Sequence, residues 1–178
     1  TALALAPTIV VVAAQVAASL AWITVSGEDA PELIASAPVS AAAVDRAKLG
    51  AVFLPVLSIL ALPLVGLALV SWPSAMVAAL FAAAAGTSTA LLNFWHPMPA
   101  NQRGMLRRHS QSKVIALLEH GLAILWAIAI VMALIGSLLA LVPIAVAVAI
   151  LAFHRGRHGR PATPATVRPV PVERPALA

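Results

Sequence analysis

The sequence contains no cysteine and few charged residues. The lack of cysteine excludes disulfides and metal sites built on thiolates. The five histidines show no H-E-x-x-H or comparable ligand spacing, so we expect neither a bound metal nor another cofactor. Charged residues make up only 10% of the chain, whereas hydrophobic residues make up 62%. A water-soluble domain could not bury that much apolar surface, so the composition predicts an integral membrane protein.

Long apolar runs divide the chain into membrane-spanning segments. A bilayer core about 30 Å thick needs roughly 20 helical residues. Three apolar runs reach that length without a charged side chain, at residues 2–25, 49–71 and 74–94. The stretch 114–153 is about twice as long as one span. Gly136-Ser137 near its middle predicts a tight turn between two further spans, 114–135 and 138–153.

These runs predict an all-α fold, a polytopic transmembrane bundle of about five membrane-spanning helices within residues 1–153. The segments 26–48 and 95–113 then form the two long loops. The tail 154–178 is basic and rich in proline. That composition disfavours helix and cannot build a core, so we expect the tail to be disordered.

All eleven cations lie in the two long loops and the tail. Two spans separate each of these segments from the next, so a single orientation places every cation on the cytoplasmic side, in agreement with the positive-inside rule. The N-terminus then lies outside. The net charge of +5 does not call for nucleic acid as a partner, because the anionic headgroups of the lipid bilayer account for cations beside apolar runs.

Two compositional features concern the origin of the chain. Arginine outnumbers lysine and alanine is abundant, a bias that we expect from a GC-rich bacterial genome. We therefore expect a multi-pass protein of the bacterial cell (inner) membrane. The chain begins at Thr1 with neither an initiator Met nor a basic n-region, so we expect a later portion of a longer protein rather than a signal peptide.

The first long loop carries signals for two short helices. Ser26 with Asp29 three residues later is typical of a helix start, and Pro38 ends such a helix. Ser40 can cap a second helix, residues 41–48, that runs into the next span. We call this loop the elbow. Its charged candidates for contact with a partner are Glu28, Asp29, Glu32, Arg46 and Lys48.

The elbow resembles the first cytoplasmic loop of ABC-2 type transporter permeases. The matching residues are Gly27-Glu-Asp-Ala-Pro-Glu-Leu-Ile-Ala-Ser-Ala-Pro-Val-Ser, followed by Arg46-Ala-Lys-Leu at the start of an apolar helix. In that family an acidic helix start, an Ala-Pro-Val turn and a Lys before the next span recur. The segment Trp95-His-Pro-Met-Pro-Ala-Asn-Gln-Arg-Gly is similar to the second long loop of such permeases. The resemblance covers roughly residues 20 to 135; the second loop matches more weakly than the first, and elsewhere only hydropathy matches.

The resemblance implies a C-terminal portion of a permease that serves an ATP-driven ABC exporter. A separate ABC ATP-binding subunit would dock on the elbow, and a second permease copy or half would complete the transport path. The chain itself would hydrolyse nothing. The alternative, judged without the resemblance, is that the elbow is a membrane-surface linker whose charges simply remain hydrated.

Inside the predicted spans, prolines and small residues admit two interpretations. Pro55 and Pro63 interrupt backbone hydrogen bonding, so we expect a kink that faces protein or a cavity and forms either a gate or a packing contact. The small residues of segment 82–89 let a neighbouring helix approach closely. We expect them to serve packing, with a polar substrate path as the alternative.

Glu119 is the only charge inside an apolar run and is therefore a candidate intramembrane site, for example for a proton or a cation. It follows Lys113 by six residues, a rise of only about 9 Å. The alternative is a structural role, in which water or an arginine such as Arg108 pairs with the Glu119 carboxylate near the membrane interface. His120 projects about 100° away from Glu119, and we assign it no chemistry, because a lone histidine more often hydrogen-bonds a neighbouring helix than binds a metal.

Catalysis within this chain is not expected. The sequence has no phosphate-binding glycine loop, no nucleophile elbow and no paired carboxylates inside a span. We therefore expect a transport permease rather than an enzyme. The alternative is a helical membrane scaffold that binds partner proteins or lipids and transports nothing.

Overall fold

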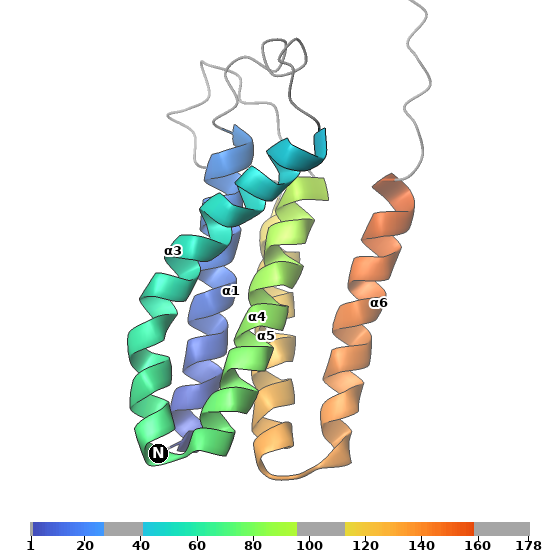
Figure 1. The fold of residues 1–178 in the computed structure, drawn as a ribbon. Helices are drawn as coiled ribbons and strands as arrows, with labels where there is room; N and C mark the ends of the chain where they lie inside the picture. Colours follow the sequence, from blue (N-terminus) through green and yellow to red (C-terminus); the bar gives the residue numbers. More distant parts are fainter. Residues whose placement is uncertain (1, 27–40, 96–112, 159–178) are drawn as a thin grey trace, which may run out of the picture.

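The computed structural model describes residues 2–26, 41–95 and 113–158, and these segments are almost entirely helical (Figure 1). Five helices in this part of the chain are long and apolar enough to cross a membrane. They are α1 (Ala2–Ser26), α3 (Ala41–Val70), α4 (Trp72–Trp95), α5 (Lys113–Leu134) and α6 (Leu141–His158). A short 3-10 turn, η2 (Leu138–Ala140), precedes α6. The predicted all-α membrane-spanning bundle of about five helices is confirmed.

Two helices extend beyond the spans predicted for them. α3 starts at Ala41 and runs without interruption to Val70, so the predicted helix over 41–48 and the following span are one element. It remains a single helix through both of its prolines. α6 continues to His158. Residues 154–158, which we assigned to the disordered tail, therefore belong to a helix, and the remainder of the tail lies outside the described residues.

The predicted turn at Gly136-Ser137 is confirmed. Gly136 has a φ of 73°, a conformation that glycine adopts without strain. The backbone N–H of Ser137 donates to Met132 O at 2.9 Å, and that of Gly136 donates to Ala133 O at 3.0 Å. These two bonds form a Schellman motif, which ends α5 and satisfies its last carbonyls. The Ser137 side chain then accepts from Leu139 N and caps η2.

The connection between α3 and α4 is even shorter, because only Ser71 separates the two helices. The backbone N–H of Ser71 donates to Leu67 O at 2.8 Å, and its carbonyl accepts from Ala75 N at 3.0 Å. Its hydroxyl lies 2.9 Å from that of Ser74. The polar groups of the turn are therefore bonded within the turn itself.

All the charged helix ends lie at the same end of the bundle. Figure 1 shows the C-terminal ends of α1, α4 and α6 beside the N-terminal ends of α3 and α5. Arg46, Lys48 and Arg155 lie on these helix ends. We call this the cation end and the opposite end, with the turns at Ser71 and Gly136, the turn end. This arrangement is the one expected if all the cations lie on the same side of the membrane.

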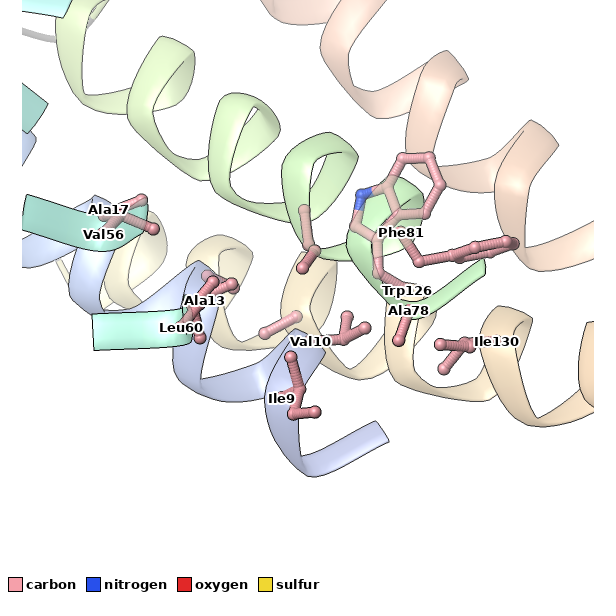
Figure 2. Packing of buried hydrophobic residues seen from close by; sticks show 14 of the residues in the cluster. Ile9, Val10, Ala13, Ala17, Val56, Leu60, Ala78, Phe81, Trp126 and Ile130 are labelled. Atoms are coloured by element: carbon pink, nitrogen blue, oxygen red, sulfur yellow. The ribbon is translucent and has the colours of Figure 1, made fainter. Parts of the chain in front are cut away.

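α4 lies at the centre of the bundle and contacts the four other long helices, while α1 packs against α3, α4 and α5. The contact of α1 with α4 depends on small residues. A Cβ added to Gly86 would lie 3.4 Å from Ala17 Cβ and 3.6 Å from Ala13 O. The predicted packing role of segment 82–89 is therefore confirmed. Figure 2 shows side chains of α1, α3, α4 and α5 gathered in the apolar core.

Candidate intramembrane polar site

Glu119 lies on α5 and is buried, with 6% of its surface exposed. Its Oε1 accepts a hydrogen bond of 2.7 Å from Asn93 Nδ2 on α4. The same amide nitrogen donates its second hydrogen to Thr89 O at 3.1 Å. Asn93 is thus fixed to its own helix by one N–H and holds the carboxyl group of α5 with the other.

Thr89 continues the polar contacts from α4 to α1. Its side chain is fully buried, and Oγ1 lies 2.9 Å from Ala14 O across the helix interface. Oγ1 also lies 3.1 Å from Ala85 O and 3.2 Å from Gly86 O on its own helix. Its one proton therefore serves carbonyls of both helices, and the interhelical distance is the shortest of the three.

Ser88 and Trp126 form a second bond between α4 and α5. Trp126 Nε1 donates to Ser88 Oγ at 3.1 Å, and Ser88 Oγ donates to Ala84 O at 2.7 Å. The indole also packs edge to face against Phe81, with ring centroids 5.9 Å apart and an interplanar angle of 78°. Such aromatic pairs add stability beyond the area that they bury.

These contacts define a polar cluster that we call the α4 polar cluster: Ser88, Thr89, Asn93, Glu119 and Trp126. It extends from the middle of the bundle toward the cation end, since Glu119 lies only about 9 Å along α5 from its first residue. Within the described segments, every fully buried polar side-chain atom has a hydrogen-bond partner. The cluster is therefore a satisfied network, as buried polar groups in a membrane require.

The chemistry available to the cluster is limited to hydrogen bonding and to one proton or one cation at Glu119. No group of three His, Asp or Glu side chains that could hold a metal ion occurs in the described part of the chain. His120 is exposed, and its Nδ1 lies 2.7 Å from Ala116 O on its own helix. The hydrogen bond of His120 thus lies within its own helix rather than across to a neighbouring one. Arg108, suggested as a partner of Glu119, lies outside the described residues.

The elbow is described only in part. Glu28, Asp29 and Glu32 lie outside the described residues. Arg46 is exposed and Lys48 is half-buried, and both lie near the start of α3. They project in different directions, because two helical residues are separated by about 200°. The structure therefore places the basic members of the elbow on the same helix as the second span.

The sequence analysis did not identify Asn93 or Trp126 as parts of a site, whereas Ser88 and Thr89 lie in segment 82–89, which it assigned to helix packing. A signal was present for Asn93, which follows Thr89 by four residues in an otherwise apolar segment and therefore lies on the same helix face. For Trp126 the sequence carries no comparable signal, because its bond to Ser88 depends on the rotation of α4 against α5.

No protein-family model matches the sequence, and no curated protein or solved structure matches it either. The function is therefore argued from the residues and the geometry of the chain itself.

Proposed function

We propose that this chain is the membrane-spanning permease component of an ATP-driven ABC exporter in a bacterial cell membrane. In this proposal a separate ATP-binding subunit contacts the elbow at the cation end. ATP is hydrolysed on that subunit, and a second permease copy or half completes the path for the substrate. The resemblance of the elbow to ABC-2 permeases motivates the proposal.

The observation that best supports it is the continuity of α3. The helix comprises 30 residues, a length of about 45 Å at 1.5 Å per residue. Arg46 and Lys48 lie near its start, and the remainder is the second membrane span. A displacement of the elbow would therefore act directly on a span that packs against α1 and α4. A rigid helix of this kind is one of the elements through which coupling between distant sites is carried.

A specific observation favours the alternative, a scaffold that transports nothing. The interior of the described bundle is filled by apolar side chains, many of them alanine, and its fully buried polar side-chain atoms are hydrogen-bonded. The groove found at its surface has a volume of about 330 Å³ and is lined by apolar residues of α1 and α5. This groove offers no polar lining to a substrate. If the chain transports a polar substrate, the path has to form with a further subunit.

The test is whether an ABC ATP-binding subunit co-purifies with this chain from its native membrane in mild detergent. We expect the two proteins to co-migrate and the chain to stimulate ATP hydrolysis. Changing Glu28, Asp29 and Glu32 together to Ala is expected to abolish both effects. Glu173→Ala, which removes an acid outside the elbow, is the matched control and should change neither. Association and stimulation that survive the triple substitution would contradict the proposal.

A further inference from the structure

The outward face of α1 carries polar side chains where the bundle meets its surroundings. The inward face is rich in alanine and packs against α3, α4 and α5. On the opposite face, residues alternately three and four positions apart lie toward the surface. We call them the α1 outer stripe: Leu5, Thr8, Val12, Gln15, Ser19 and Trp22. Gln15 is half-buried, and the other five are exposed.

Gln15 carries the side-chain amide of this stripe, and lipid hydrocarbon offers that amide no hydrogen-bond partner. It lies near the middle of a span that runs from Leu3 to Val25. The Thr8 hydroxyl donates to Ala4 O at 3.0 Å, whereas the Gln15 amide has no hydrogen-bond partner within the described part of the chain. Every fully buried polar atom there is bonded, so the amide reaches the bundle surface. An amide facing lipid without a partner is strongly unfavourable.

We propose that the α1 outer stripe is the contact surface between two copies of this chain, with α1 packed against α1. Two copies inserted in the same orientation place Gln15 at the same depth in the membrane. A carboxamide carries both a donor and an acceptor, so two of them pair across a twofold axis along the membrane normal. Each copy therefore offers its own Gln15 amide, at the same depth in the membrane, as the hydrogen-bond partner of the other.

The spacing of the stripe supports the same partner. Steps of three, four, three, four and three residues repeat with a period of seven, the period that packs two helices at a left-handed crossing of about 20°. Thr8 and Ser19 are small enough to let the two backbones approach on either side of Gln15. The apolar groove between Pro7 of α1 and Ile128 of α5 begins beside the stripe. It offers room for side chains of the second copy.

This contact does not depend on the proposed transport function, because a scaffold would dimerise through the same surface. The lack of cysteine makes it directly testable. Single cysteines are introduced at Val12 or Ser19 in the full chain, reconstituted in lipid vesicles and oxidised with copper phenanthroline. Matched controls carry cysteine at Leu62 on α3 or Val146 on α6, both exposed. We expect disulfide-linked dimers at the stripe positions and roughly tenfold fewer at the controls.

A second measurement removes the amide instead of probing the surface. Single-molecule photobleaching in vesicles of increasing lipid content measures the monomer–dimer equilibrium. Gln15→Leu is expected to weaken association roughly tenfold, and Gln15→Asn should restore most of it. Ser58→Leu is the control, because the Ser58 hydroxyl is exposed on α3 and bonded to Leu54 O of its own helix. It should leave association unchanged.

Three outcomes would overturn the proposal. The first is equal cross-linking at the stripe and at the control positions, and the second is unchanged association of the Gln15→Leu protein. The third is modification of cysteines at Val12 and Ser19 by a membrane-impermeant thiol reagent without any dimer. That result would assign this face of α1 to a water-filled path. Failure of any of these tests leaves the co-purification with an ATPase unaffected, so the two proposals are separable.

Discussion

The two halves of the bundle hold their helices together in different ways. From its middle to the cation end, α4 is bonded to α1 through Thr89 and to α5 through Asn93. Toward the turn end, side chains such as Val10, Ala78 and Ile130 pack by shape alone. The membrane-spanning helices are thus joined by specific bonds in one half and by apolar contact in the other.

The difference shows what each kind of contact can specify in a membrane. Lipid tails are as apolar as leucine, so apolar packing gains little over contact with lipid and depends on close fit. A buried amide or carboxyl group has no such alternative and must find a definite partner. We therefore expect the hydrogen-bonded half to determine how α1, α4 and α5 are rotated against one another, and the apolar half to tolerate substitution better.

The largest expected effect concerns the placement of the two ends. In intact cells, a cysteine at Leu138, which is 85% exposed at the turn end, should react completely with a membrane-impermeant thiol reagent. A cysteine at Gly156 near the cation end should stay unlabelled until the cells are permeabilised. Labelling of the Gly156 position from outside would reverse the proposed orientation.

The next effect should separate the two halves by their stability. Asn93→Leu removes a partner of the buried Glu119 and is expected to lower the free energy of unfolding by about 2 kcal/mol. Ile130→Ala, in the apolar half, should cost only about 1 kcal/mol, because the lost contacts are partly replaced by lipid. Unfolding in mixed detergent and lipid micelles measures both. A cost for Ile130→Ala equal to or above that of Asn93→Leu would break the comparison.

The smallest effect isolates one hydroxyl. Thr89→Val removes the bond to Ala14 O of α1 and should destabilise the bundle by about 0.6 kcal/mol. Thr87→Val is the matched control, because Thr87 is exposed and its hydroxyl bonds only to Ala83 O of its own helix. It should leave stability unchanged in the same unfolding measurement. Equal effects of the two substitutions would show that the interhelical bond contributes nothing.

Much of this fold could be predicted from the sequence, because a bilayer reduces the choice of structures. A run of about 20 apolar residues can only cross as a helix that satisfies its own backbone. The turn at Gly136 was also predictable from the sequence, since glycine adopts without strain the positive φ that ends α5. The charge clusters correctly indicated which helix ends lie together.

The contacts between helices could not be predicted in the same way. Glu119 stood out as a buried acid, but its partner Asn93 lies on a different helix, 26 residues earlier. Which face of α5 meets α4 depends on packing along the whole length of both helices, for instance on Gly86 against Ala17. Periodicity alone carries little information here, because the helices are apolar on nearly all sides.

The single-residue connection at Ser71 has a consequence for biosynthesis. With only that residue between α3 and α4, there is no loop that a translocation channel could carry across independently of its flanking spans. The two helices must enter the bilayer together as one hairpin. The orientation of one helix therefore fixes the opposite orientation of the other. A positive charge added beside Ser71 would thus have to invert or expel the pair together.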